Sequence, residues 1–199
     1  FSISFWGKSD DADSSNLQYI VDLGLNDTTH FNFVLRDNDI YYTWEGGGTV
    51  TRKKSTSNPI TQGKWHHYVA IYNSSGVVVK FYVDTIEVTV TTSQSNSDSN
   101  MSGDEDACYI GARGNETQGW NGNMGDLALY SAELSFNDVH TLYNGREPYN
   151  HLNGIAVDSL EAWFQMGDGI EHGSGTTLYD MSANSYNATL TNINGANSG

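Results

Sequence analysis

The amino-acid sequence predicts an all-β protein, built as a two-sheet antiparallel sandwich with one short helix. Residues 1–6 (FSISFW) alternate apolar and polar side chains, which is the pattern of a strand that buries one face. Similar short segments, about a dozen in all, are separated by clusters of Gly, Asn, Asp and Ser. The 5 Trp, 12 Tyr and 7 Phe supply enough bulky apolar surface for a core between two sheets.

Three further strands are expected in the first part of the chain, at residues 18–23, 30–35 and 40–44. The last two flank residues 36–39, whose sequence is RDND. Asp and Asn tolerate left-handed backbone conformations, so this sequence favours a tight hairpin turn. We therefore expect the two flanking strands to pair directly.

The clearest hairpin has strands at residues 65–72 and 77–83 around a polar turn. Asp84 and Thr85 then turn the chain into a strand at residues 86–90. Residues 91–106 are rich in Ser, Asn and Asp and are expected to form an exposed loop.

One face of the strand at residues 65–72 carries Trp65, His67, Val69 and Ile71, and we expect this face to point into the core. His66 points to the opposite face, so the two adjacent histidines cannot bind one metal ion together. His67 is interpreted as a hydrogen-bonded core histidine.

The hydrophobic spacing becomes helical only between residues 131 and 145. Ser135 is a suitable N-cap, Asp138 stands three residues later, and Gly145 follows the expected end of the helix. Late strands are expected at residues 160–166 and 187–191, with a Gly-rich and Asp-rich loop between them.

The charge balance excludes several classes of partner. Nine Lys and Arg against 24 Asp and Glu give a formal net charge of -15, which repels nucleic-acid phosphates and anionic lipids. No stretch of the sequence is apolar enough for a membrane span, so membrane insertion is not expected. Cys108 is the only cysteine, so an intramolecular disulfide is excluded. It lies in an apolar run and is expected to be buried.

Several segments resemble laminin G-like domains of the concanavalin A-like superfamily, in the order in which that family has them. These segments are FSISFW at residues 1–6, GKWHHYVA at 63–70, FYVD at 81–84, YIG at 109–111, and WNGNMGDLALYSAELS at 120–135. The resemblance implies a jelly-roll sandwich that serves as a binding or adhesion module for glycan or protein, outside a cell or on a virus particle. The alternative function is a virion structural protein, such as a capsid decoration or fibre domain that contacts other virion proteins.

The end of the chain departs from the usual order of that family. Residues 162–190 resemble strands that normally open such a domain. We expect residues 1–199 to form one domain, closed in permuted order by residues 158–194; the alternative is that a second copy begins here. Because residue 1 already lies within a strand pattern, we also expect the chain to be part of a longer protein.

Exposed aromatic rings beside Asp or Asn are typical of sugar-binding surfaces, because pyranose faces stack on them. Tyr41, Tyr42, Trp44 and Trp120 have such neighbours and are the candidate ligand-binding residues. The competing interpretation places each of them in the core or in a cross-strand pair.

Calcium is a candidate cofactor, because this hard cation binds carboxylate, amide and carbonyl oxygens. Asp180, Asn184 and Asn187 could supply such oxygens from a loop that resembles a loop of the laminin G-like family. Asp126 is the other candidate, at a position where related domains often hold an acidic residue. The alternative is that these side chains cap turns through their own backbone.

Catalysis is not expected. Glycoside hydrolases on this type of sandwich need two carboxylates about 5–9 Å apart, usually from alternate residues of one strand. The sequence contains neither Glu-x-Asp-x-Glu nor Glu-x-Asp-x-x-Glu, and it contains no Gly-x-Ser-x-Gly, P-loop or dinucleotide-binding motif. Glycoside hydrolysis is therefore the least favoured of the three functions.

Overall fold

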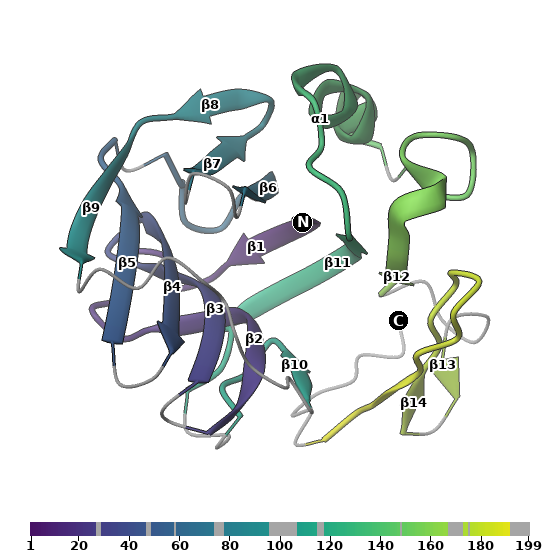
Figure 1. Ribbon diagram of the computed structural model, residues 1–199, viewed down its shortest axis with the longest axis horizontal. Helices are drawn as coiled ribbons and strands as arrows, with labels where there is room; N and C mark the ends of the chain where they lie inside the picture. Colours follow the sequence, from purple (N-terminus) through teal and green to yellow (C-terminus); the bar gives the residue numbers. More distant parts are fainter. Residues whose placement is uncertain are drawn as a thin grey trace.

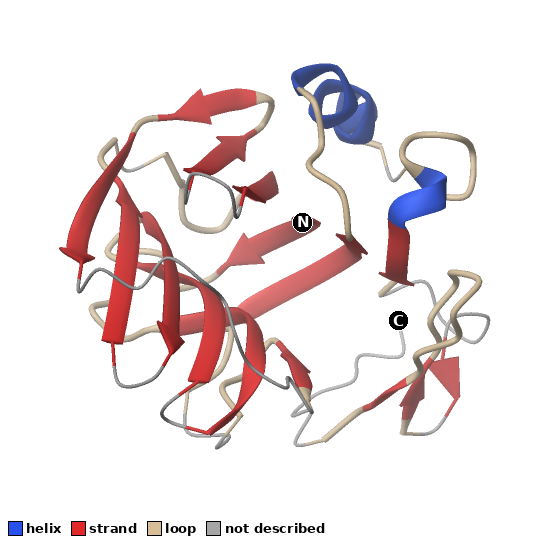
Figure 2. Cartoon of the chain, in the orientation of Figure 1, coloured by secondary structure: helices blue, strands red, loops and turns tan. Residues whose placement is uncertain are grey.

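The computed structural model describes residues 1–26, 29–46, 49–57, 59–73, 78–95, 107–114, 118–147, 149–166, 173–174 and 176–191. Two six-stranded antiparallel sheets, counted over these residues, pack face to face (Figure 1). Figure 2 shows that strands dominate the chain and that the helical segments gather on one side. The prediction of an all-β jelly-roll sandwich with one short α-helix is confirmed.

The first sheet, sheet A, contains strands from both ends of the described chain. Its spatial order is β12 (Leu160–Phe164), β11 (Gly122–Tyr130), β1 (Ser2–Ser9), β6 (Trp65–Asn73), β7 (Val78–Val83) and β8 (Ile86–Val88). β12 pairs with β11 along residues 127–130 and thereby extends the sheet.

The second sheet, sheet B, contains most of the first half of the chain. Its spatial order is β10 (Cys108–Ile110), β2 (Gln18–Asn26), β3 (Thr29–Arg36), β4 (Asp39–Gly46), β5 (Thr49–Ser55) and β9 (Val90–Ser95). A small third sheet consists of β13 (Gly173–Ser174), β14 (Thr177–Leu178) and β15 (Ala188–Thr189).

The predicted turns have the expected backbone geometry. Asp37 (φ 52°) and Asn38 (φ 60°) adopt left-handed conformations between β3 and β4. Asp84 (φ 50°) and Thr85 (φ 72°) do the same between β7 and β8. In both hairpins the strands pair directly on either side of the turn, as predicted.

The core between the sheets is rich in aromatic side chains. Phe5, Phe33, Tyr68 and Phe81 are fully buried there. The rings of Phe5 and Tyr68 stack at 4.7 Å, and the ring of Phe5 meets that of Phe33 edge to face at 5.9 Å. Cross-strand and cross-sheet ring pairs of this kind fix the register of the strands that carry them.

A second apolar cluster covers the outer face of sheet A, the face directed away from sheet B. It contains Val69, Tyr130 and Trp163 from the sheet and Val139 and Leu142 from the helix α1 (Phe136–Tyr143). The segment after α1 contains the short helices η1 (Asn144–Arg146) and η2 (Val157–Ser159), and Figure 1 shows α1 and η2 on this side of β11 and β12. The central part of sheet A is therefore buried on both faces.

The predicted N-cap of the helix is confirmed. The Ser135 side chain accepts a hydrogen bond from the N–H of Asp138, and the Asp138 carboxylate accepts one from the N–H of Ser135. The first residue with a left-handed conformation after the helix is Asn144 (φ 45°), and Gly145 (φ 65°) follows it.

Four local predictions were wrong. Residues 90–95, expected to lie mostly in a loop, form β9, while residues 96–106 lie outside the described residues. β5 was not predicted, because its sequence TVTRKKS is too polar for a recognisable alternation. Cys108 is exposed, since it lies at the start of the edge strand β10. Trp65 is exposed, and the face that it shares with His67 and Val69 packs under α1 instead of between the sheets.

Among the described residues, no helix has the length and apolar character required to cross a membrane.

Candidate ligand-binding cavity

A cavity of about 860 Å³ opens at one end of the outer face of sheet A. Its walls come from β1, β6 and β11, from the segment before β6, from the turn between β7 and β8, from the end of η1, and from the residues after β12. This volume lies within the range of about 300–1,000 Å³ that is typical of small-molecule sites. The cavity is therefore large enough for a sugar-sized or larger ligand.

Two tryptophans give the cavity its aromatic surface. Trp65 exposes 48% of its surface. Trp6 is half-buried, because its ring lies against His67 at 5.2 Å and against Tyr143 of α1 at 5.6 Å. In the sheet, Trp6 is opposite Gly125, which has no side chain to fill the space beside the indole.

A β-bulge places Asp126 in the cavity wall. Ser4 of β1 is opposite Ala128 and Trp6 is opposite Gly125, so Asp126 and Leu127 together oppose Phe5. The extra residue is accommodated by the left-handed backbone of Asp126 (φ 52°). Bulges commonly redirect a side chain in this way near functional sites.

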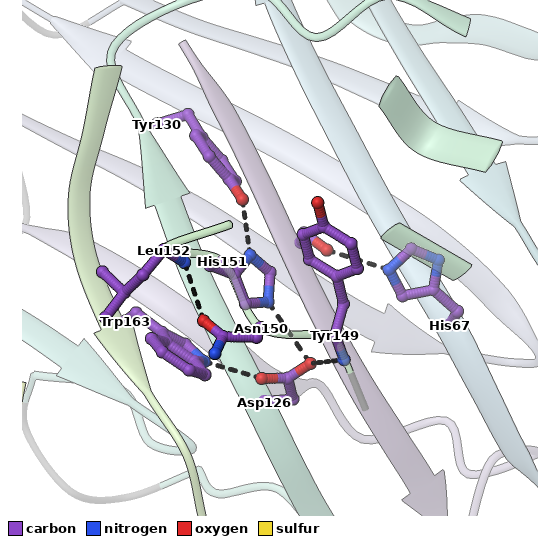
Figure 3. A network of polar contacts seen from close by, with 9 residues as sticks. His67, Asp126, Tyr130, Tyr149, Asn150, His151, Leu152 and Trp163 are labelled. Carbon is purple, nitrogen blue, oxygen red and sulfur yellow. Dashed lines mark hydrogen bonds and ion pairs between the residues drawn. The ribbon is translucent and has the colours of Figure 1, made fainter. Parts of the chain in front are cut away.

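The Asp126 carboxylate lies at the centre of a buried polar network (Figure 3). Its Oδ1 accepts a hydrogen bond of 2.6 Å from Trp163 Nε1, and its Oδ2 accepts the N–H of Tyr149 at 3.3 Å. The His151 Nε2 lies 3.3 Å from the same Oδ2, and the other ring nitrogen is bonded to the hydroxyl of Tyr130. Asp126 thus ties the segment after η1 to β11 and β12.

His67 lies beside this network and is bonded to the Ser4 hydroxyl at 2.9 Å (Figure 3). Burial disfavours the charged imidazolium and lowers the pKa of His67 to about 4, although the nearby carboxylates of Asp126 and Asp84 act in the opposite direction. The same kind of burial raises the pKa of the Tyr130 hydroxyl. The interpretation of His67 as a buried, hydrogen-bonded histidine agrees with this geometry, although its neighbours belong to the outer cluster.

His66 and Asp84 form a second polar pair in the cavity wall, with 2.7 Å between His66 Nδ1 and Asp84 Oδ2. The His66 Nε2 accepts the N–H of Thr61 at 3.1 Å, so Nδ1 carries the proton that is donated to Asp84. Burial alone would raise the pKa of Asp84, but the hydrogen bonds from His66 and from the N–H of His67 outweigh it and lower this pKa. Neither ring nitrogen of His66 is left to act as a general base.

Three residues of the cavity wall have left-handed backbones, namely Asp84 (φ 50°), Asp126 (φ 52°) and Arg146 (φ 82°). Asp tolerates this conformation well, whereas an arginine adopts it only where the surrounding structure holds it there. Strained residues of this kind tend to gather at functional sites.

The four aromatic candidates do not form one surface. Tyr42 is fully buried, with its ring 5.6 Å from that of Tyr72, and this burial removes it from the candidate ligand contacts. Tyr41 lies on the opposite face of β4, where Lys54 Nζ lies 5.3 Å from its ring centre. Trp120 packs edge to face on Phe5 at 6.0 Å, and its Nε1 donates to the carbonyl of Asn123.

Trp44 belongs to β4, where its backbone is opposite Phe31 and Thr51, but its side chain lies outside the described residues. A ligand role for Tyr41, Trp44 and Trp120 stays a prediction.

The calcium candidates lie in two separate places. Asp126 belongs to the cavity wall, and Asp180 belongs to the loop before β15. The Asp180 carboxylate accepts the N–H groups of Trp163, Ser182 and Tyr186 at 2.8 Å each and the Ser182 hydroxyl at 2.7 Å. These bonds outweigh the effect of burial and lower its pKa.

The two asparagines of that loop also have partners in the protein. The Asn187 side chain accepts the N–H of Asp180, and the Asn184 side chain donates to the carbonyl of Glu161. Within the described residues, no group of three or more His, Cys, Asp and Glu side chains is arranged to hold a metal ion. This loop geometry matches the alternative interpretation, in which the Asx residues organise the turn, while calcium binding stays a prediction.

Sequence reasoning missed most residues of the cavity. Trp65 and Lys64 stand just before a clear strand, and Arg146 stands just after the helix, so nothing local marks them as neighbours. The one local signal is that β1 and β6, which are adjacent in the sheet, each carry a tryptophan, Trp6 opposite His67 and Trp65 opposite Lys8. Of the predicted site residues whose side chains the structure describes, Asp126 alone lines the cavity.

Solved structures with a similar fold include carbohydrate-binding and receptor-binding domains. The CBM40 domain of the Ruminococcus gnavus IT-sialidase has a TM-score of 0.59 at 11% identity, over 71% of this chain and 80% of that chain. A putative carbohydrate-binding protein from Bacteroides ovatus has a TM-score of 0.60 at 14% identity, over 95% of this chain and 54% of that chain.

The receptor-binding domain of botulinum neurotoxin D has a TM-score of 0.54 at 18% identity, over 73% of this chain but only 37% of that chain. At such identities these likenesses show the fold alone. No curated protein matches the sequence. A family model does match residues 1–140, and this chain therefore belongs to the family described as the concanavalin A-like lectin/glucanases superfamily.

Proposed function

We propose that this chain is a non-catalytic carbohydrate-binding module and that the cavity on sheet A is its glycan site. The observation that carries the proposal is the exposed indole of Trp65 at a cavity whose other side chains can form hydrogen bonds. The indole offers a flat apolar face on which the C–H groups of a pyranose ring can stack. Lys64, Asn123, Arg146 and Gln165 supply polar groups around it for the sugar hydroxyls.

The geometry of the cavity suits binding better than a flat surface would. The Asp126 network and the ring contacts of Trp6 hold the walls in place, which reduces the entropy lost when a ligand binds. Aromatic residues in such pockets usually contribute most of the binding free energy. Loss of the Trp65 ring should therefore weaken binding more than loss of any one polar group.

The structural neighbours support the same class of function. Two of the three are described as carbohydrate-binding, and the Ruminococcus gnavus CBM40 domain has also been solved with α2,3-sialyllactose bound. The third, from botulinum neurotoxin D, is a receptor-binding domain, which supports a protein surface as the alternative partner. Most such modules act outside the cell, and we propose an extracellular location. The virion role has no specific support in the fold or the cavity.

Hydrolysis is the second candidate, because the cavity wall contains two carboxylates, those of Asp84 and Asp126. A glycosidase needs one carboxyl group whose pKa is raised, so that it can donate a proton. The pKa of Asp84 is lowered instead, and both carboxylates already accept hydrogen bonds from protein donors. These contacts favour a structural role for both acids.

A glycan array with the intact chain tests the proposal, followed by calorimetric titration of the best ligand. We expect Trp65→Ala to weaken binding at least tenfold, whereas Tyr186→Ala, which removes an exposed ring outside the cavity, leaves it unchanged. Equal binding by the two variants would contradict the choice of site. An absence of binding across the array, or hydrolysis of a bound glycan that is lost in Asp84→Asn, would contradict the proposed function.

A further inference from the structure

We propose that the ligand of this cavity carries a carboxylate group, as a hexuronic or nonulosonic acid sugar does, and that Arg146 and Lys64 bind this group. The inference rests on the proposed function and narrows it to one class of sugar. Three features of the cavity support it: the placement of its cations, the orientation of Arg146, and the orientation of its acids.

The cavity contains two cations although the chain as a whole is strongly acidic. Only 9 of the 199 residues are Lys or Arg, against 24 acids, yet two of the nine line this one cavity. Elsewhere, Lys54 pairs with Asp39 at 2.8 Å and Arg36 pairs with Asp37 at 3.2 Å. Among the described residues, no carboxylate lies within ion-pair distance of Lys64 or Arg146, although the charge of Asp84 acts on Arg146, so both cations can bind an anionic ligand.

The guanidinium of Arg146 is already positioned. Its Nε donates a 2.8 Å hydrogen bond to the hydroxyl of Tyr143, whose ring stacks on Trp6. The edge of the guanidinium formed by Nη1 and Nη2 can bind a carboxylate through two parallel hydrogen bonds. The left-handed backbone at Arg146 (φ 82°) sets the direction in which this exposed side chain leaves the main chain.

The acids of the cavity bind groups of the protein itself. Asp84 accepts hydrogen bonds from His66 and from the N–H of His67. Asp126 is buried and accepts hydrogen bonds from Trp163 and Tyr149. Lys64 and Arg146, in contrast, are exposed, so a ligand that enters the cavity meets the cations first.

The test is a set of calorimetric titrations with three oligosaccharides of equal length, which end in a neutral hexose, a hexuronic acid or a nonulosonic acid. We expect at least one acidic sugar to bind ten times more tightly than the neutral one at low salt. Sodium chloride should lower the affinity for the acidic sugar and not that for the neutral one, because salt ions screen the attraction between exposed charges. Comparison of the titrations with the two acidic sugars identifies which of these acids the cavity binds.

Arg146→Gln and Lys64→Gln should reduce the affinity for the acidic sugar at least tenfold and the affinity for the neutral sugar by a clearly smaller factor, because Gln still offers polar atoms to the sugar hydroxyls but no charge to the carboxylate. Lys80→Gln, which removes an exposed cation from outside the cavity, is the matched control. Equal affinity for acidic and neutral sugars would overturn this inference and leave the proposed function standing. Failure of all sugars to bind would overturn both. The melting temperature of each variant verifies that it is folded.

Discussion

The indole of Trp163 on β12 donates a 2.6 Å hydrogen bond to the carboxylate of Asp126 on β11. Asp126 is 6% exposed and also accepts the N–H of Tyr149, so one side chain satisfies donors from two segments that cover sheet A. Replacement of a buried acceptor leaves each of its donors without a partner, at a cost of about 1–3 kcal/mol per donor. The position of Asp126 therefore predicts a large effect on stability.

The first prediction is that Asp126→Ala lowers the free energy of unfolding by about 2–4 kcal/mol, and that Asp126→Asn, which keeps one acceptor oxygen, lowers it by less. Urea denaturation followed by tryptophan fluorescence measures both. Asp158→Asn, at an exposed position on η2, is the control and should change the free energy by less than about 0.5 kcal/mol. Equal stability of Asp126→Ala and the control would show that the network does not stabilise the fold.

The second prediction concerns pH. The pKa of His67 falls from 6.5 to about 4 on folding, because burial excludes the charged ring. Between pH 6.5 and 4, His67 therefore binds a proton in the unfolded chain but not in the folded chain. Its contribution to the free energy of unfolding is complete above pH 6.5 and is lost as the pH falls toward 4. A shift of this size corresponds to about 3 kcal/mol.

His67→Gln should accordingly flatten the dependence of unfolding free energy on pH between 6.5 and 4. The exposed His140 provides the matched control, since His140→Gln should keep the slope of the unaltered protein. The slope is the decisive quantity, because His67→Gln also loses the contact with Ser4 and is less stable at every pH. An unchanged slope would mean that the pKa of His67 is the same in the folded and the unfolded protein.

The sandwich was predictable because its signals are local. Alternation in residues 1–6 and 65–72 identifies strands from a few neighbouring side chains, and Ser135 with Asp138 marks the start of α1 in the same way. β5 escaped prediction because its residues Thr49–Ser55 are polar and owe their conformation to pairing with β4 and β9. Strand pairing of this kind depends on tertiary context and not on propensity.

The cavity was not predictable for a related reason. β6 is buried on both faces, so its alternation does not say which face lies between the sheets, and Trp65 was assigned to the wrong one. The layer that covers the other face comes from residues 134–163, far along the chain. Trp6, Trp65 and Arg146 line one cavity only when that layer is packed on the sheet, and no single segment of the sequence indicates that they are neighbours.

The third prediction separates a structural role of Asp180 from calcium binding. All hydrogen bonds that its carboxylate accepts in the described chain join Trp163 of β12 to the loop at residues 182–186. We expect Asp180→Ala to lower the melting temperature by several degrees, and by the same amount in 5 mM calcium as in EDTA. Asp158→Asn again serves as the exposed control.

Calcium that binds only the folded state must raise the melting temperature. A rise in the unaltered protein that disappears in Asp180→Ala would therefore establish the metal site at Asp180, Asn184 and Asn187. A rise that persists in this variant but is lost in Asp126→Asn would place calcium at the cavity instead.

The last prediction tests whether residues 158–194 close this domain or begin another one. Trp163 is 4% exposed in the outer cluster, and its neighbours Ala162 and Phe164 lie in the core between the sheets. A chain that ends at residue 157 would keep the pairing of β11 with β1 but would turn β11 into an unpaired edge strand, and it would expose part of both apolar clusters. We expect that chain to lose cooperative unfolding, and Trp163→Ala in the full chain to cost about 3–5 kcal/mol.

A chain that ends at residue 191 retains every contact that the structure describes, and it should unfold like the full chain; it is the matched control for the truncation. Denaturant unfolding by circular dichroism and by fluorescence should give coincident curves for this control. If the chain that ends at residue 157 also unfolds cooperatively with unchanged stability, β12 belongs to a separate unit. Loss of cooperativity in that chain alone means that residues 158–191, which contain β12 to β15, belong to this sandwich, since these residues are all that distinguishes the two truncations.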